Sequence, residues 1–315
     1  MLKYSLKRLL ALIPVLIGVS ILVFLILHLT PGDPARIMLG PKATEQAIEA
    51  LHRQLGLDLP LHIQYFQWVT NILKGDWGRS IQLKREVLPL VLTRFKATAI
   101  LTVFAAFIAI TFGLLAGIVS ATKQYSLWDR LLMFLALMGF CLPVFWLGLV
   151  LQVLFGLKLG WLPISGMHPP GQAGMGSIFR YIILPGFSLA VGTMAEIARM
   201  TRSSMLEVIR QDYIRTARAK GLSERVVTYS HALRNALIPV VTVVGMQIGF
   251  LLSGAVLVEI IFAWPGIGTL MVNGILARDF PLVQGAILFV ATIYVFVNLI
   301  VDLVYALLDP RISYN

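Results

Sequence analysis

Few side chains in this sequence have the type and placement that chemistry requires. Glu196 lies towards the end of a long apolar segment, where a carboxylate is costly and often functional. Arg199 follows three residues later on the same face of a helix, so a structural ion pair is the alternative that we favour over a place in a pathway. Asp302 lies near the inner end of the last apolar segment, where interfacial placement or pairing with a basic loop residue explains it.

The other polar residues form no pattern typical of an active site or a metal site. His62, His168 and His231 lack the spacing of metal ligands, and the single cysteine, Cys141, lies in an apolar run typical of a small buried side chain. No nucleophile is placed beside a base, and no Gly-x4-Gly-Lys-Ser/Thr sequence occurs. We therefore expect no catalytic, metal or cofactor site in this chain, and any ATP-driven process would need separate ATPase subunits.

Composition places the chain in a membrane. Of its 315 residues 58% are hydrophobic and only 13% charged, about half the charged share of a soluble domain. The net charge of +11 does not indicate nucleic acid, because the charges lie at the ends of apolar segments, where lipid head groups and the positive-inside bias act.

The predicted fold is all-α and polytopic. Six apolar segments are long enough to cross a bilayer: 9–29, 97–121, 131–157, 181–200, 236–258 and 282–308. Pro143 should kink the third of them. Basic residues concentrate on one side of this arrangement, which predicts that both termini are cytoplasmic. The expected organisation is a cytoplasmic N-terminus and first span (1–29), an external segment (30–96), a core of five spans (97–308) with a cytoplasmic loop (203–235), and a cytoplasmic tail (309–315).

The external segment is expected to be small and helical. Residues 44–55 have amphipathic spacing and end at Gly56, and residues 61–73 place aromatic and aliphatic side chains on one side. The sequence 75–80, Gly-Asp-Trp-Gly-Arg-Ser, predicts a turn.

The longest charged passage between two spans predicts a helical elbow. Residues 213–220 are mostly good helix formers, Gly221 can end that helix with a left-handed conformation, and Ser223 can cap a second helix. The small residues Ala217 and Ala219 would let a partner approach closely. A solvated basic loop is the alternative.

This elbow carries a family resemblance. Tyr213-Ile-Arg-Thr-Ala-Arg-Ala-Lys-Gly221 resembles the Tyr-x-Arg-Thr-Ala-Arg-Ala-x-Gly loop of ATP-binding-cassette (ABC) importer permeases of the dipeptide/oligopeptide/nickel branch. The Glu of the general Glu-Ala-Ala pattern is absent, because Arg215-Thr-Ala occupies its place. The resemblance implies that the loop docks into an ATPase subunit through Tyr213, Arg215, Thr216, Ala217, Arg218, Ala219, Lys220 and Gly221.

Two further stretches are similar to the same branch. Glu259-Ile-Ile-Phe-Ala-Trp-Pro-Gly-Ile-Gly268 implies a structural element at the outer mouth, formed by Glu259, Phe262, Trp264, Pro265, Gly266 and Gly268. Here Trp264 suits a membrane interface, and the Pro and Gly residues break the helix. The second stretch is Leu142-Pro-Val-Phe-Trp146. The candidate pathway residues are Pro143, Phe145, Trp146, Glu196 and Gln247, with ordinary packing as the alternative.

The resemblance implies a multi-pass permease subunit of the cytoplasmic (inner) membrane that passes peptides. Its expected partners are a second homologous permease, two ABC ATPases that bind ATP and Mg, and an external solute-binding protein. Glutathione or a nickel chelate are alternative substrates. A proton-driven secondary transporter, with Glu196 or Asp302 in the relay, is the rival class.

Overall fold

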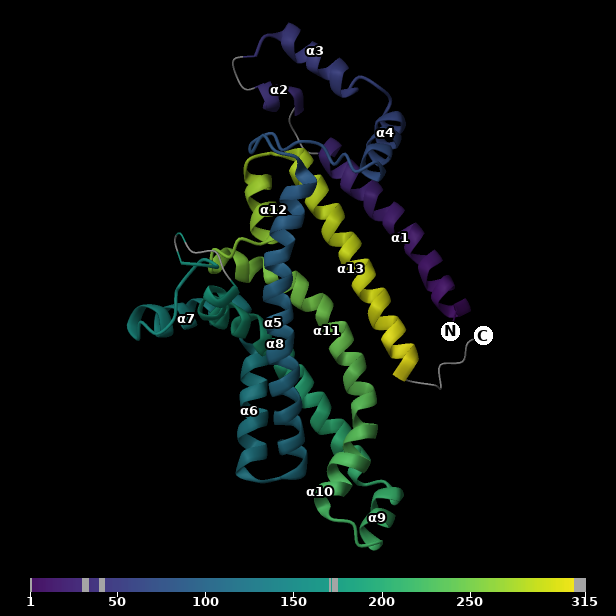
Figure 1. Ribbon diagram of the computed structural model, residues 1–315, viewed down its shortest axis with the longest axis vertical. Coiled ribbons are helices and arrows are strands. Elements are labelled where there is room, and N and C mark those ends of the chain that lie inside the picture. The colour runs from purple at the N-terminus through teal and green to yellow at the C-terminus, as the bar shows by residue number, and fades with distance from the viewer. Residues whose placement is uncertain (1, 30–33, 40–42, 170, 172–174, 309–315) are drawn as a thin grey trace. The chain divides into compact units, whose positions relative to one another are not determined.

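The computed structural model of the protein describes residues 2–29, 34–39, 43–169, 171 and 175–308 (Figure 1). Within these ranges the chain forms α-helices and π-helical segments, and the described residues contain no named β-strand. The all-α class predicted from the sequence is confirmed.

The chain forms two compact units. The core unit combines Ala97–Pro265 with Val297–Asn315, and the second unit combines Leu2–Lys96 with Gly266–Phe296. The part of the chain from Gly266 to Phe296 thus belongs to the second unit. The division into an external segment (30–96) and a core of five spans (97–308) stays a prediction.

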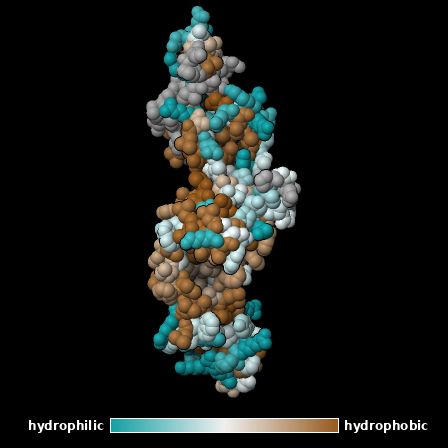
Figure 2. Space-filling model, turned by 90° about the vertical axis from the view of Figure 1, so that its left-hand side faces the viewer, coloured by the Kyte–Doolittle hydropathy of each residue, from teal (hydrophilic) through white to brown (hydrophobic). Residues whose placement is uncertain are grey.

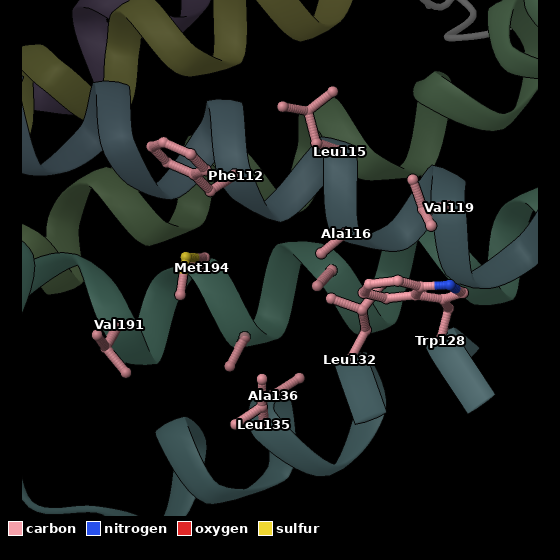
Figure 3. Close-up of a pocket in the computed structure, with 12 residues that line it drawn as sticks. Phe112, Leu115, Ala116, Val119, Trp128, Leu132, Leu135, Ala136, Val191 and Met194 are labelled. Atoms are coloured by element: carbon pink, nitrogen blue, oxygen red, sulfur yellow. The ribbon is translucent and has the colours of Figure 1, made fainter. Parts of the chain in front are cut away.

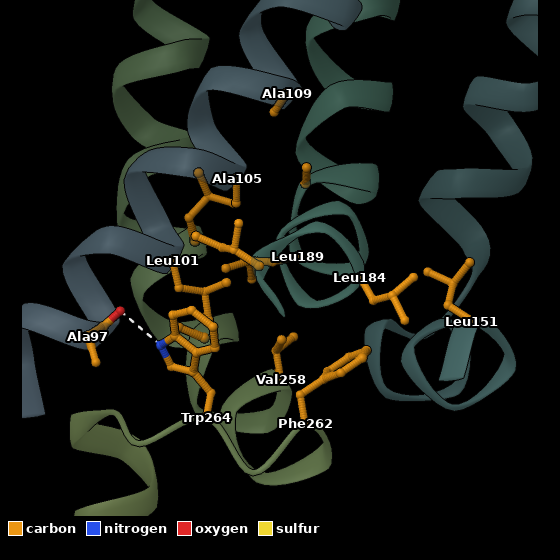
Figure 4. Packing of buried hydrophobic residues seen from close by; sticks show 14 of the residues in the cluster. Ala97, Leu101, Ala105, Ala109, Leu151, Leu184, Leu189, Val258, Phe262 and Trp264 are labelled. Carbon is orange, nitrogen blue, oxygen red and sulfur yellow. Dashed lines mark hydrogen bonds between the residues drawn. The ribbon is translucent and has the colours of Figure 1, made fainter. Parts of the chain in front are cut away.

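The core unit is built from helices of very different lengths. They are α5 (Val87–Thr122), α6 (Leu127–Cys141), α7 (Val144–Leu151), η1 (Gln152–Lys158), α8 (Met175–Ile209), α9 (Asp212–Ala219), α10 (Glu224–Val226), η2 (Val227–Ala232), α11 (Leu233–Ile261) and the end of α13 (Phe280–Leu308). The core of this unit lies between α5, α8 and α11 (Figure 4). Close approach of α5 and α8 needs glycine: a Cβ on Gly117 would lie 2.5 Å from the Thr201 Cβ.

The segment 131–157, predicted as one kinked span, is two helices. Helices α6 and α7–η1 meet at an angle of 106° around Leu142 and Pro143. Leu142 is extended, with a ψ of 126°, as expected for a residue before proline, and Pro143 cannot donate a backbone hydrogen bond. The break at Pro143 is thus confirmed, but it is sharper than a kink within one helix.

Several helices suit a membrane. In the described ranges, four helices are long and apolar enough to cross a membrane: Val87–Thr122, Gly176–Ile209, Glu224–Ile261 and Phe280–Leu303. If the bent pair of α6 and α7–η1 counts as one span, there are five. The apolar stretch described for α1, Leu9–Leu25, is shorter. The count of six spans stays a prediction.

The second unit contains the described part of residues 30–96, the segment that the sequence predicts to be external. Its helices are α1 (Leu2–Leu29), α2 (Pro34–Leu39), α3 (Glu45–Leu55), α4 (Leu61–Leu73), α12 (Ile267–Leu276), and the starts of α5 and α13. Gly56 ends α3 with a φ of 68°, as predicted. Helix α4 packs on α1, where the Tyr65 hydroxyl lies 2.7 Å from the Ser20 hydroxyl. Its Phe66 and Leu73 remain exposed.

A buried carboxylate fixes the loop that precedes α5. Asp279 is fully buried and accepts hydrogen bonds from the Ser80 hydroxyl at 2.5 Å and from the backbone N–H groups of Ile81 and Gln82 at 3.1 Å. These bonds join the end of the predicted 75–80 turn to the start of α13. Sequence reasoning missed this contact, because it joins residues about 200 positions apart.

Candidate coupling elbow and the helices that hold it

The elbow has the local conformation predicted from its sequence. Helix α9 ends at Ala219, and Gly221 follows with a φ of +79°, which confirms the left-handed glycine. The Gly221 N–H donates to the Arg218 carbonyl at 2.9 Å, which satisfies an end carbonyl of the helix. Ser223 is extended and precedes α10, as predicted, although its side chain makes no capping hydrogen bond.

One face of α9 is buried against the ends of its neighbours. We call this set the elbow cluster: Ala121 of α5, Met205 of α8, Ile214 and Ala217 of α9, Val227 and Ala232 of η2, and Ala236 of α11. Ala217 is 8% exposed, so the expectation that it offers a small surface to a partner is wrong. Ile214 and Ala217 are three residues apart and share the inward face of a helix, which leaves Ala219 as the small residue on the exposed face.

The opposite face of α9, with the two residues that follow it, is exposed and carries three basic side chains, Arg215, Arg218 and Lys220. The exposed residues of the predicted coupling set are Tyr213, Arg215, Thr216, Arg218, Ala219, Lys220 and Gly221. Figure 2 shows hydrophilic residues gathered at the end of the core unit that carries α9 and α10, next to an apolar surface.

Polar contacts brace the elbow across its bend. The Arg218 Nε donates to the Glu224 carboxylate at 2.7 Å, and this bond raises the pKa of the guanidinium above its ordinary value. The Asn235 amide donates to the Tyr213 hydroxyl at 2.7 Å and so ties α9 to the start of α11. Sequence reasoning did not single out Glu224 or Asn235, since their partners are set by the bend.

The first part of the predicted outer-mouth motif lies in the core. Trp264 is fully buried, and its Nε1–H donates to the Ala97 carbonyl at 2.9 Å (Figure 4). The packed helices thus supply the partner that the indole N–H needs, and the place of Trp264 at the membrane interface stays a prediction. Glu259 is also fully buried and accepts a hydrogen bond from the Thr98 hydroxyl at 2.5 Å.

The rest of the motif ends one helix and starts another. Helix α11 ends at Ile261, Phe262 is buried, and Ala263 has a φ of +45°. Gly266 is the N-cap of α12, and Gly268 is buried in its first turn. The helix break predicted from the Pro and Gly residues is confirmed.

The candidate pathway residues have separate surroundings. Glu196 pairs with Arg199 at 2.5 Å, as predicted, and the guanidinium lies 5.0 Å from the centre of the Phe140 ring. Phe145 and Trp146 are exposed on α7. A cavity of about 380 Å³ between α5, α6 and α8 is lined by other residues of these helices, nearly all apolar (Figure 3).

Two further candidates can be placed. The Gln247 side-chain oxygen accepts a hydrogen bond from Thr193 at 3.2 Å, and Pro143 is the N-cap of α7. In the described part of the chain, no group of three or more His, Cys, Asp or Glu residues could hold a metal ion.

Comparison with known proteins decides the family. Residues 109–314 match the family described as "Binding-protein-dependent transport system inner membrane component", and residues 1–102 match its N-terminal companion, described as "Binding-prot-dependent transport system membrane comp, N-term". The chain belongs to this family. It is an ABC importer permease, a transport subunit with several membrane helices.

Individual relatives extend over the whole chain. The permease is 48% identical to the dipeptide transport system permease protein DppB of Alkalihalophilus pseudofirmus, with 100% of both chains covered. It is 46% identical to the di/tripeptide transport system permease protein DppB of Pseudomonas aeruginosa and 45% identical to the glutathione transport system permease protein GsiC of Salmonella typhimurium, again with 100% of both chains covered.

A solved structure supports the fold. The permease is similar to a chain of an inward-facing MetNI methionine ABC transporter, with a TM-score of 0.58, 16% identity, and coverage of 70% of this chain and 96% of that chain. At this identity the likeness shows the fold alone.

One buried ion pair of the permease was missed by sequence reasoning. Asp129, at the start of α6, is 4% exposed and pairs with Arg202 of α8, 73 positions away. The only local signal is the Ser126-x-x-Asp129 spacing of a helix N-cap, and the Ser126 hydroxyl does accept from the Asp129 N–H at 3.3 Å. That signal predicts a cap and gives no hint of the arginine.

Proposed function

We propose that this chain passes short peptides across the cytoplasmic membrane and that separate ATPase subunits drive it through the α9 elbow. The observation that carries the proposal is the shape of the elbow: an exposed face on a short helix whose opposite face is fixed to the ends of α5, α8 and α11. A partner that pushes on such a helix moves three long helices together, as coupling requires.

The docking surface comprises Tyr213, Arg215, Thr216, Arg218, Ala219, Lys220 and Gly221. Ala217, which the resemblance also implicates, acts from the buried side by seating α9 on its neighbours. This division of roles follows from which side chains reach solvent.

Peptides are the substrate class that the relatives support. Two relatives are named for dipeptide or di/tripeptide transport, and relatives of similar identity are named for glutathione, itself a small peptide. Glutathione is therefore the second candidate. Free peptides and glutathione share a backbone amide, a charged amino group and carboxylates, so a single pathway can suit both.

The proposed assembly follows the family resemblance. It contains this permease, a second homologous permease, two ATPases that bind ATP and Mg, and an external solute-binding protein. Both termini would be cytoplasmic, with six spans including α1 and the bent α6–α7 pair. The motif that includes Glu259 and Trp264 would lie at the outer mouth, where it holds the helix ends together.

The test is uptake by the reconstituted complex. Proteoliposomes are made with both permeases and both ATPases, with the binding protein outside and ATP enclosed in the lumen. They should take up a labelled dipeptide through complexes whose ATPases face the lumen. A proton ionophore should leave that uptake unchanged. Uptake that needs a proton gradient and ignores ATP would overturn the proposal, and uptake of labelled glutathione but no dipeptide would reassign the substrate.

A further inference from the structure

A polar cluster at one end of α6 joins three helices. The Arg202 guanidinium donates from Nε to the Asp129 Oδ1 at 2.8 Å and from an Nη to Oδ2 at 3.0 Å. The Ser120 hydroxyl of α5 also donates to Oδ1, and the Tyr125 N–H donates to Oδ2 at 2.9 Å. The carboxylate thus accepts bonds from α5, from the α5–α6 loop and from α8, in a fixed two-pronged geometry.

This polar cluster adjoins the elbow cluster on two helices. Ser120 precedes Ala121, and Arg202 lies three residues before Met205, and both Ala121 and Met205 pack in the elbow cluster. The elbow cluster, as far as the structure describes it, includes no residue of α6. The short turn 123–126 joins the start of α6 to the end of α5, and the Asp129 carboxylate adds a polar tie from α6 to α8, which also holds the elbow.

Between its two ends, α6 is loosely packed on one side. The cavity of about 380 Å³ separates Leu132 and Ala136 of α6 from Ala116 of α5 and Met194 of α8 (Figure 3). Tight contact returns near the far end, where a Cβ on Gly139 would lie 2.7 Å from a Val191 methyl carbon. One side of α6 thus borders a hollow, with the Asp129 bonds at one end of the helix and the Gly139 contact near the other.

Beyond Pro143 the chain reaches the other end of α11. The Gln152 amide donates to the Ile261 carbonyl at 2.9 Å and to the Ile164 carbonyl at 2.7 Å. Helix α6 therefore leads from the elbow end of the core unit to the bend at Pro143 and to α7–η1, which is anchored at the end of α11.

We propose that Asp129 and Arg202 are positioning residues for transport, which pass a displacement of the elbow to α6 and through it to α7–η1. The proposal rests on the proposed function, because it assumes that an ATPase moves the elbow. Removal of the pair breaks the polar tie between the start of α6 and α8, while the docking face of α9 stays intact. The ATPases then still bind and hydrolyse ATP, but less substrate crosses for each ATP consumed.

The decisive experiment compares single and double variants in the assembled complex. Asp129→Asn leaves the Arg202 charge without its carboxylate, which lowers the amount of assembled complex as well as coupling. The double variant, which combines Asp129→Asn with Arg202→Gln, removes both charges and so restores assembly. We expect it to assemble as the parent does, yet to take up about tenfold less dipeptide per ATP hydrolysed, within the range of typical coupling effects.

A purely structural role predicts a different result. In that case the double variant would recover both assembly and the parent ratio of uptake to hydrolysis, and the proposal would be wrong. Arg130→Gln is the matched control, since Arg130 is exposed on the same turn of α6, and it should keep the parent ratio. The parent complex tests the proposed function separately: if it shows no ATP-dependent uptake, that function fails before the variants are compared.

Discussion

Substitution of Gly221 tests whether the elbow couples ATP hydrolysis to transport. Its φ of +79° is in the left-handed region, and a Cβ placed there would meet no other atom of the chain within 4 Å. Gly221→Val therefore creates no clash within the permease, and its intrinsic cost is backbone strain. For a β-branched residue this strain is about 1–3 kcal/mol.

That strain acts on the elbow alone. The glycine is exposed and outside the elbow cluster, so the packing of α5, α8 and α11 should survive and the chain should insert into the membrane. If the valine drives residue 221 out of the left-handed region, about 1–3 kcal/mol favours a rearranged elbow, which lowers the population of the docking-competent form by about 5- to 150-fold. Uptake and ATPase association should fall accordingly.

Three companion variants identify the cause. Gly221→Ala should lose less activity, because alanine is not β-branched and adds less bulk. Gly221→Asn should retain more than alanine if strain dominates, since asparagine tolerates the left-handed region. Gly171→Val is the matched control: its φ is +80°, its Cβ also meets no atom within 4 Å, and it lies outside the elbow.

The assay measures uptake and ATP hydrolysis side by side in proteoliposomes, normalised to assembled complex. The expected order of uptake per complex is parent, Gly221→Asn, Gly221→Ala, Gly221→Val, with Gly171→Val close to the parent. If Gly221→Val transports and hydrolyses as the parent does, the elbow is not the coupling element.

Three other predictions test orientation and packing. In a cysteine-free background, a membrane-impermeant thiol reagent added outside sealed cells should label Ala50→Cys but not Ala219→Cys, and labelling at 219 would overturn the predicted orientation. Trp264→Phe removes the donor of a buried hydrogen bond and should cost about 1–3 kcal/mol, seen as a lower midpoint of thermal unfolding in detergent; an unchanged midpoint would contradict the assigned bond. Glu196→Gln breaks the pair with Arg199 and should leave uptake per assembled complex unchanged, whereas a complete loss of uptake would place Glu196 in the pathway.

Local signals predicted the helices well. Gly56 and Gly221 have the left-handed conformations that end α3 and α9, and Pro143 breaks the chain where predicted. The bounds of α4 are those read from the sequence, Leu61–Leu73. Each of these features depends on a few neighbouring residues, so one sequence is enough to predict it.

Residue types were a weaker guide to where side chains lie. Ala217 was predicted at the docking surface and is buried, and nothing in the sequence indicated that the Trp264 ring is enclosed by other helices. Hydrophobic or small side chains suit a lipid-facing, a partner-facing and an internal position alike. Which position each takes depends on helices that are distant in the sequence, such as α5, whose Ala97 carbonyl accepts the bond from Trp264.

The sequence by itself determined the membrane class, the approximate places of the apolar helices, the elbow at Gly221 and, through its motifs, the family. The tertiary structure alone decided that α6 and α7 turn by 106°, that one face of α9 is fixed to three helices, and that Asp129 meets Arg202. The physical reason is how far apart in the sequence the residues that determine each feature lie. Hydropathy and helix ends are set by residues close along the chain, whereas a buried carboxylate finds its arginine only after α5, α6 and α8 have packed.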